Sequence, residues 1–179
     1  MIQTIRLHHL LRESGSNGSR HLVTRPTGAA VRDGIERALR DSDGATVLLD
    51  FTEVELMDLS CADEVVAKLL LGDSGALCHL VLCNLREDQL EAVDHVLRHH
   101  RLAVAAKPSA DAEPDVLGWV DEDARQVFGY MLRCGGGTVE TVARELGWTP
   151  ARAGQALGTL AARRLMLVDQ DAFLPLPLA

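Results

Sequence analysis

The stretch from Val47 to Gly72 constrains the fold most strongly, because two kinds of hydrophobic periodicity follow one another within it. Residues 47–51 form an apolar run of strand length, with Asp50 as its one polar member, which predicts a strand buried on both faces. A short acidic connector comes next. Apolar residues then repeat at helical spacing, namely Ala62, Val65, Val66, Leu69 and Leu70. The segment is therefore predicted to run from a strand through a loop into a helix.

Ser60 is predicted to cap that helix. It stands just before the periodic apolar residues, and Asp63 follows three residues later, at the spacing of a capping box. A hydroxyl at this position has two interpretations. It can be an ordinary N-cap, which stabilises a helix by about 1 kcal/mol. It can also carry a phosphate, because free backbone N–H groups and the positive end of the helix dipole favour a dianion there.

The tetrapeptide Asp58-Leu59-Ser60-Cys61 resembles a motif of the STAS domain, the fold of anti-sigma factor antagonists and of sulphate-transporter tails. In the phosphorylatable antagonists a strand is followed by Asp-Ser-Ser-Gly and a helix. Ser60 falls on the second serine, which is the one phosphorylated in that family, whereas Leu59 and Cys61 replace the first serine and the glycine. The closer likeness is to the STAS-like branch, which often continues Ala-Asp-Glu, as residues 62–64 do here.

The resemblance implies a mixed sheet backed by helices, and a surface that docks an anti-sigma factor or a histidine-kinase-type ATPase that binds ATP. That docking surface is expected to comprise Asp58, Leu59, Ser60, Cys61, Glu64 and Lys68. Phosphorylation of Ser60 would add about two negative charges to it. Asp58, Asp63 and Glu64 would oppose the phosphate, and the nearest cation in the sequence is Lys68. We therefore expect docking without modification ahead of a phosphorylation switch.

The rest of the chain before residue 107 fits one sheet backed by helices. Strands are predicted at residues 2–7, 21–24, 77–85 and 102–105, and helices at residues 26–40 and 86–100. Residues 12–20 are rich in Gly and Ser and predict a loop, and residues 41–44 predict a helix stop. This order agrees with the fold implied by the resemblance. The expected fold class of residues 1–106 is therefore α/β (α+β), with a mixed sheet.

A linker and a second, smaller domain are predicted after residue 106. Residues 107–118 carry two prolines among small and acidic residues, which indicates a linker. In residues 119–179 we predict a helix up to Cys134, a second from the cap Thr138 to Gly147, and a third from Thr149 to Arg164. A hairpin over residues 165–174 completes a succession that resembles a winged helix, and residues 138–150 resemble helix-turn-helix sequences of bacterial regulators.

The third predicted helix offers a candidate DNA-reading face. Its members are Arg152, Gln155, Thr159, Arg163 and Arg164. From residue 119 onward, however, the chain has six arginines, no lysine and seven acidic residues, which is not the excess of cations that phosphate contacts need. Ala151, Gly154 and Gly158 instead form a small-residue strip where another helix could pack. We expect protein contact or dimerisation here, with DNA binding as the alternative.

The composition disfavours several function classes. A net charge of −8 argues against a general affinity for nucleic acid or for anionic membrane surfaces. The first residues do not resemble a signal peptide, and no apolar run has the length of a membrane span, so we expect a cytoplasmic protein. The four cysteines form no Cys-x-x-Cys pair, which is typical of buried thiols in a reducing cytosol.

No catalytic, metal or cofactor site is predicted. The acidic residues between 50 and 58 have no companion nucleophile, lysine or glycine-rich phosphate loop. His95 and His99 lie four residues apart, a spacing that can bind metal, but no third ligand accompanies them. The sequence therefore favours a non-enzymatic bacterial signalling adaptor that binds a protein partner. The alternative is a DNA-binding transcription regulator whose STAS-like domain is the sensor, and self-association stays open in both cases.

Overall fold

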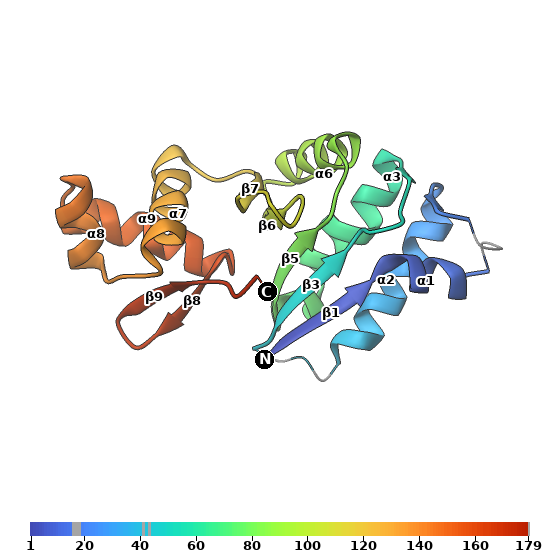
Figure 1. The fold of residues 1–179 in the computed structure, drawn as a ribbon, viewed down its shortest axis with the longest axis horizontal. Coiled ribbons are helices and arrows are strands. Elements are labelled where there is room, and N and C mark those ends of the chain that lie inside the picture. The colour runs from blue at the N-terminus through green and yellow to red at the C-terminus, as the bar shows by residue number, and fades with distance from the viewer. Residues whose placement is uncertain (16–18, 41, 43, 179) are drawn as a thin grey trace.

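The computed structural model describes residues 1–15, 19–40, 42 and 44–178. Its central element is a five-stranded mixed sheet (Figure 1). The strand order is β1 (Ile2–Arg6), β3 (Thr46–Asp50), β5 (His79–Cys83), β6 (Ala103–Lys107) and β7 (Asp115–Gly118). The strands from β1 to β6 pair in parallel, and β7 pairs antiparallel to β6. Because parallel neighbours need crossover connections, helices join the parallel strands, and the expected α/β class with a mixed sheet is confirmed.

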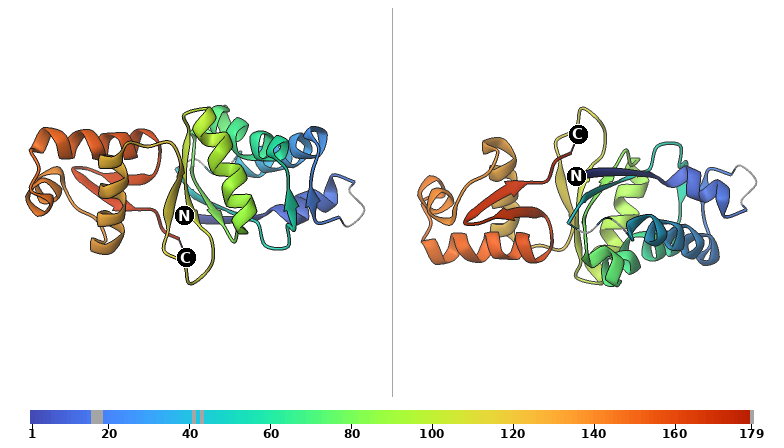
Figure 2. Two further views of the ribbon diagram at one scale, coloured as in Figure 1. Left: turned by 90° about the horizontal axis from the view of Figure 1, so that it is seen from above. Right: turned by 90° about the horizontal axis from the view of Figure 1, so that it is seen from below.

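The helices that connect the parallel strands lie on one face of the sheet (Figure 2). They are α1 (Leu7–Glu13), α2 (Arg25–Leu39), the consecutive segments α3 (Leu59–Ala62), η1 (Asp63–Ala67) and α4 (Lys68–Leu71), then α5 (Asp73–Ala76) and α6 (Glu87–His99). A short parallel pair of β2 (His21–Leu22) and β4 (Leu56–Met57) stands apart from the main sheet. The apolar cluster between this layer and the sheet is the larger of two cores.

The opposite face of the sheet is covered by the C-terminal part of the chain (Figures 1 and 2). This part contains α7 (Glu122–Cys134), α8 (Val139–Leu146), α9 (Pro150–Ala162) and a hairpin of β8 (Met166–Asp169) and β9 (Ala172–Pro175). Val81, Ala105 and Val116 of the sheet belong to one buried cluster with Phe128 of α7 and Leu157 of α9. The sheet is therefore the middle layer of the structure.

The strands alternate between these two cores, which explains their apolar runs. In β5, Leu80 and Leu82 join the core on the helical side, whereas Val81 between them joins the core on the C-terminal side. In β3 the same alternation places Val47 and Leu49 on the helical side. A strand covered on both faces can be apolar at every position. The prediction of a doubly buried strand at residues 47–51 is thus confirmed.

The linker prediction is wrong at both ends of residues 107–118. Lys107 is the last residue of β6, and β7 adds an antiparallel strand where irregular chain was expected. The end of β7 is also fixed by two hydrogen bonds. Gly118 N donates to Asp94 Oδ1 at 2.7 Å, and Trp119 N donates to the Leu102 carbonyl at 2.8 Å. A strand of four residues is too short for its alternation to stand out beside the prolines.

Two further differences lie in the N-terminal part. Leu7 begins α1 and does not end the first strand, and α1 continues to Glu13, inside the predicted loop. Residues 16–18 of that loop, and residues 41 and 43 of the predicted helix stop, lie outside the described residues. Leu7, Leu10 and Leu11 do stand at helical spacing, and Leu7 and Leu11 are buried, but seven residues hold only one such repeat, directly after the strand pattern.

The local signals of the C-terminal helices are confirmed. Thr138 precedes α8 and its side chain accepts a hydrogen bond from Thr141 N, and Thr149 does the same for Arg152 N at the start of α9. Gly147 ends α8 with a φ of 67°, the left-handed conformation that glycine adopts without a steric penalty. In this part of the chain the capping chemistry alone places the helix boundaries.

Candidate functional site

Asp58, and not Ser60, caps the helix that begins at Leu59. The Asp58 backbone is extended, and its Oδ1 accepts hydrogen bonds from Cys61 N and from Ser60 Oγ, both at 2.8 Å. Its Oδ2 accepts from Thr24 N at 3.1 Å, which ties the cap to the start of α2. Burial raises the pKa of Asp58, but these hydrogen bonds outweigh it, and the pKa lies below its usual value. The capping prediction is therefore wrong, because Asp58 is an equally favourable cap two residues earlier.

We expect Asp58→Ala to lower the free energy of unfolding by about 1–2 kcal/mol, because three hydrogen-bond donors lose their acceptor. Ser60→Ala removes one partly exposed hydrogen bond and should cost about 0.5 kcal/mol. Urea unfolding of the two variants measures the difference. If Ser60 were the cap, the larger loss would belong to Ser60→Ala.

Not all of the six residues predicted to form a docking surface are exposed to solvent. Leu59 is 52% exposed, and Asp58, Ser60 and Lys68 are partly exposed. Cys61 is fully buried, and its thiol donates a hydrogen bond to the Thr24 carbonyl at 3.0 Å. Burial, together with the Asp58 charge, raises the pKa of Cys61 to about 12. Glu64 is only 3% exposed. The prediction that these last two residues contact a partner is therefore wrong, because both point into the fold.

Glu64 is the centre of a buried ionic cluster. Its Oε1 accepts from Arg25 Nη1 at 2.8 Å and from Lys68 Nζ, and its Oε2 accepts from Arg32 Nη1. The residue lies in η1, a π-helical segment, and α2 crosses so closely that a Cβ atom at Gly28 would lie 2.9 Å from Glu64 Cβ. Burial raises the pKa of Glu64, but the hydrogen bonds and charges of the three cations lower it further, below its usual value.

Asp63 extends this cluster to the end of α6. It accepts from Arg25 Nη1 at 3.0 Å and from His100 Nε2 at 2.8 Å, and these hydrogen bonds lower its pKa against the effect of burial. The negative charges at positions 63 and 64 are thus balanced by Arg25 and Arg32 of α2 and by Lys68 of α4, and His100 adds a hydrogen bond from the residue after α6. Asp58 is left as the carboxylate that would oppose a phosphate on Ser60 directly, since the Ser60 hydroxyl is already bonded to it.

Two surface residues near this loop were missed. Leu56 in β4 is 45% exposed, and it lies three residues before Leu59 in the chain. Arg25 donates hydrogen bonds to both Asp63 and Glu64. It stands 38 residues before Asp63 and 39 residues before Glu64 in the sequence. No local pattern can find such a cation. The exposure of Leu56 could have been inferred from its place between acidic residues.

The five candidate DNA-reading residues do not form one face. Arg152 is held by Asp123 of α7 through two hydrogen bonds of 2.7 Å, and it stacks on Trp148 with 4.0 Å between the guanidinium carbon and the ring centroid. Gln155 lines a cavity beside Arg152 whose other wall carries the acids of the α7 N-terminus. Thr159 Oγ1 donates to the Gln155 carbonyl of its own helix at 3.0 Å. The start of α9 therefore faces acidic residues, which repel a phosphate backbone.

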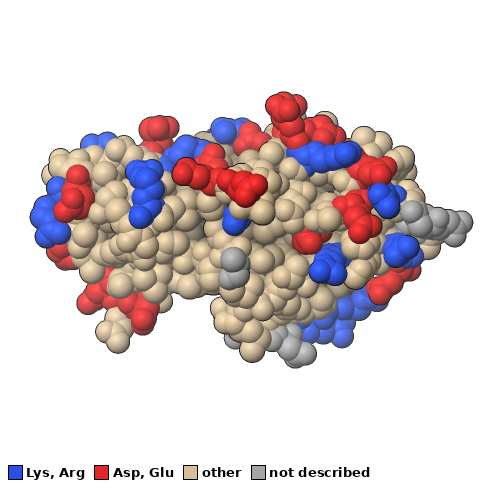
Figure 3. All heavy atoms as spheres, viewed as in Figure 1, with Lys and Arg blue, Asp and Glu red and all other residues tan. Residues whose placement is uncertain are grey.

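The two remaining residues of that set turn toward the sheet. Arg163 Nη1 donates to the Arg101 carbonyl at 2.8 Å, and its guanidinium carbon lies 5.1 Å from the Trp119 ring centroid. The Arg164 carbonyl is 3.1 Å from His79 Nδ1 in β5. On the face drawn in Figure 3, acidic and basic residues are interspersed over the C-terminal part. The Arg163 side chain and the Arg164 backbone thus belong to the contact between the end of α9 and the sheet.

Two findings concern metal ligands and membrane-spanning helices in the part of the chain that the structure describes. There, no three His, Cys, Asp or Glu side chains come together in a group able to hold a metal ion. Within the same residues, no helix combines the length and the apolar character needed to cross a bilayer.

No protein-family model matches this chain, and no curated protein and no solved structure matches it either. Function is therefore inferred from the residues and their geometry.

Proposed function

We propose that this chain is a non-enzymatic regulatory adaptor that binds a protein partner through the Leu59 surface, defined as Leu56, Asp58, Leu59 and Ser60. The observation that carries the proposal is the exposure of two large apolar side chains, Leu56 at 45% and Leu59 at 52%, on either side of a helix cap. A single exposed leucine is ordinary in a folded protein. Leu56 and Leu59, however, lie near the same capped helix N-terminus and have polar neighbours. An interface likewise has an apolar centre and a polar rim.

The Leu59 surface is held rigidly by what lies beneath it. Asp58 accepts three hydrogen bonds, one of them from the start of α2, and Cys61 is fully buried directly below. Behind them, the ionic cluster of Glu64 fastens η1 to α2. Preorganisation of this kind lowers the entropy that a docking residue loses on binding. The loop is therefore suited to recognition without rearrangement.

The proposed partner is an ATP-binding protein of the anti-sigma or histidine-kinase type, in accordance with the resemblance of residues 58–64 to STAS-like domains. Such a partner could also phosphorylate Ser60. The phosphate would replace a hydroxyl that is 2.8 Å from Asp58 Oδ1, so it would break that hydrogen bond and place about two negative charges beside a carboxylate. Phosphorylation is therefore proposed to release the partner, and Ser60→Glu to imitate the released state.

The C-terminal helices and hairpin are proposed to be a winged-helix output module that acts by protein contact or dimerisation. Three helices followed by a hairpin support this assignment. On α9, Ala151 and Gly158 are exposed, and a Cβ atom at Gly158 would have no neighbour within 4 Å, so another helix could approach there. DNA binding ranks second, because Arg152 is paired with Asp123, and the Arg163 guanidinium is bonded to the Arg101 carbonyl.

Leu59→Asp is expected to abolish partner capture without unfolding the protein. Leu59 is half exposed at the first helical position, where an acidic residue is favoured by the helix dipole. A hot-spot residue at the centre of an interface contributes on the order of 2–4 kcal/mol, which is about 30- to 1,000-fold in affinity. The measurement is affinity capture from a lysate of the native host, with the captured proteins identified by mass spectrometry.

Val168→Asp is the matched control, because Val168 is a similarly exposed apolar residue (55%) on the hairpin. Capture of an ATP-binding kinase by the wild type and by Val168→Asp, but not by Leu59→Asp or Ser60→Glu, is the expected pattern. Equal capture by all four proteins would contradict the proposal. So would the recovery of nuclease-sensitive DNA without any protein partner.

A further inference from the structure

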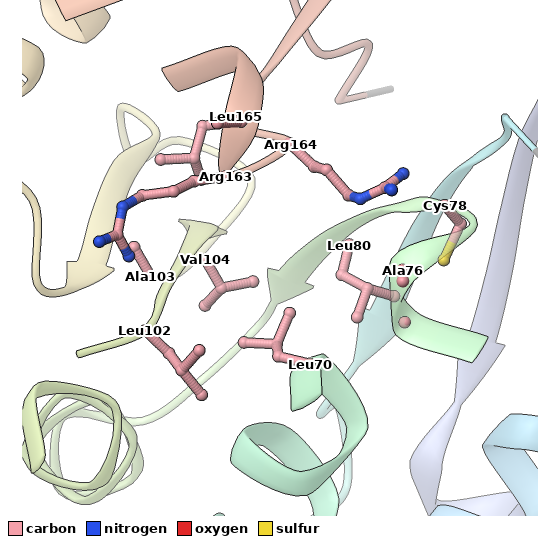
Figure 4. Close-up of a pocket in the computed structure, with 12 residues that line it drawn as sticks. Leu70, Ala76, Cys78, Leu80, Leu102, Ala103, Val104, Arg163, Arg164 and Leu165 are labelled. Carbon is pink, nitrogen blue, oxygen red and sulfur yellow. The ribbon is translucent and has the colours of Figure 1, made fainter. Parts of the chain in front are cut away.

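A second site is indicated by a cavity on the other side of the molecule, between the sheet and the end of α9. The cavity has a volume of about 340 Å³. Its floor is apolar and is formed by Leu70, Leu80, Leu102 and Val104, with the Cys78 thiol at one side (Figure 4). Cavities of this size and character typically hold small organic ligands. Because it adjoins the first residues of β5 and β6, whereas Leu59 follows β3 and β4 in the chain, this site is separate from the Leu59 surface.

Arg164 stands at the rim of this cavity in a backbone conformation that residues with a side chain rarely adopt. Its φ is 57°, and it follows α9 at the position where glycine normally ends a helix. Leu165 N donates to the Leu160 carbonyl at 2.9 Å, which is the hydrogen bond that defines such a helix end. The Arg164 carbonyl is fixed in addition by the His79 ring at 3.1 Å. An arginine is thus held where glycine would cost less.

The guanidinium of Arg164 is free for a ligand. Among the residues that the structure describes, none makes a hydrogen bond or an ion pair with it. Arg163 differs, because its guanidinium is bonded to the Arg101 carbonyl and lies against Trp119. Figure 4 shows Arg164 extending over the cavity toward Cys78 and Ala76, while Arg163 turns to the opposite side. A partly buried cation without a counter-ion above an apolar floor has the chemistry of a carboxylate site.

We propose that this cavity binds a small carboxylate with an apolar tail, and that Arg164 is its counter-ion. The tail would lie on the leucine and valine floor, and the guanidinium would hold the carboxylate through two parallel N–H···O hydrogen bonds. The ligand would contact both the sheet and the end of α9, because the cavity is lined by both. Its binding would therefore strengthen the contact between the C-terminal part and the sheet, as expected of a ligand that binds only the folded state.

The alternative explanation of Arg164 is structural, since a cation near a helix C-terminus interacts favourably with the helix dipole. Octanoate and octan-1-ol separate the two explanations, because they share a chain length and differ in the charge. Isothermal titration calorimetry on the full chain should give a Kd of about 1 mM or tighter for octanoate, and binding of octan-1-ol should be about tenfold weaker. Arg164→Gln should weaken octanoate about tenfold and leave octan-1-ol unchanged.

Two further variants complete the test. Arg144→Gln removes an arginine that is 72% exposed on α8, and it should leave octanoate binding unchanged. Ala76→Phe places a ring at the exposed mouth of the cavity and should weaken both ligands, whatever Arg164→Gln does to stability. Equal affinities for octanoate and octan-1-ol, no effect of Arg164→Gln on octanoate, no effect of Ala76→Phe, or no octanoate binding up to 10-fold above the expected Kd would each overturn the proposal.

Discussion

Gly118→Ala is expected to lower the free energy of unfolding by about 4 kcal/mol or more, which is a large share of the roughly 5–15 kcal/mol that stabilise a typical domain. Gly118 has a φ of 90°, a conformation that alanine adopts only at a cost. A Cβ atom there would lie 2.2 Å from the Leu102 carbonyl oxygen and 2.8 Å from Leu97 Cβ. The first of these is backbone, so relief of the overlap would also break the hydrogen bond from Trp119 N to the same oxygen.

Urea unfolding monitored by circular dichroism measures this loss, and Gly158→Ala is the matched control. Gly158 lies inside α9, and a Cβ atom there meets nothing within 4 Å. The control should stabilise the protein by about 0.5–1 kcal/mol, because alanine is the better helix former. A change of less than 1 kcal/mol for Gly118→Ala would contradict the close approach of β7 to the end of α6.

Glu64→Gln is expected to lower the free energy of unfolding by about 2 kcal/mol at pH 7. Loss of one partner from a buried ion pair costs about 3–5 kcal/mol when the other charge stays buried. Here the penalty is smaller, because Arg25 and Lys68 are about half exposed and can turn toward water. Arg32 is only 21% exposed and cannot turn toward water as easily. The NH2 group of Gln would face the Arg32 guanidinium, and both are hydrogen-bond donors.

The cost of Glu64→Gln should shrink as the pH falls. The folded protein lowers the pKa of Glu64, so its stabilising effect is complete above the unfolded pKa of about 4.3 and is lost as the pH falls through the folded value. The difference in stability between wild type and variant should therefore be smaller at pH 3 than at pH 7, and it should vanish below the folded pKa of Glu64. Urea unfolding at pH 7 and pH 3 tests this, and a difference that is independent of pH would contradict it.

Glu145→Gln is the control for this comparison. Glu145 is about half exposed on α8 and pairs with the neighbouring Arg144 at 3.2 Å. Exposed pairs of this kind contribute little to stability, so no measurable change is expected at either pH. A loss comparable to that of Glu64→Gln would mean that surface charge in general, and not the buried cluster, sets the pH dependence.

Much of the fold follows from local signals. The apolar run at residues 47–51 gave a doubly buried strand, and the caps Thr138 and Thr149 gave the starts of α8 and α9. The layer that covers the second face of the sheet could not be predicted in this way. Val81 and Val116 meet Phe128 through contacts between residues far apart in the chain, and β7 is a strand only because β6 lies beside it. Strand pairing of this kind is set by tertiary context.

The sequence indicated the segment that contains the candidate site, but not which residue caps the helix or which residues are buried. Asp58 and Ser60 both favour the cap position and stand two residues apart, and sequence alone cannot decide which of the two accepts hydrogen bonds from the free N–H groups. Glu64 was expected at the surface because of the resemblance of residues 58–64 to STAS-like domains. Its partners Arg25 and Arg32 stand 39 and 32 residues earlier in the chain, so no local pattern indicated that it would be buried and paired. Of the predicted docking residues, Leu59 is exposed and Asp58, Ser60 and Lys68 are partly exposed, so the structure leaves these four accessible.

Site-specific photo-cross-linking in the native host tests the proposed docking most directly. A photoreactive phenylalanine analogue would replace Leu59 in one protein and Val168 in another, since both positions are about half exposed. We expect position 59 to cross-link to an ATP-binding protein of the histidine-kinase type, position 168 not to do so, and Ser60→Glu to abolish the cross-link. Cross-linking of the same protein from both positions, or of no protein from position 59, would contradict the account.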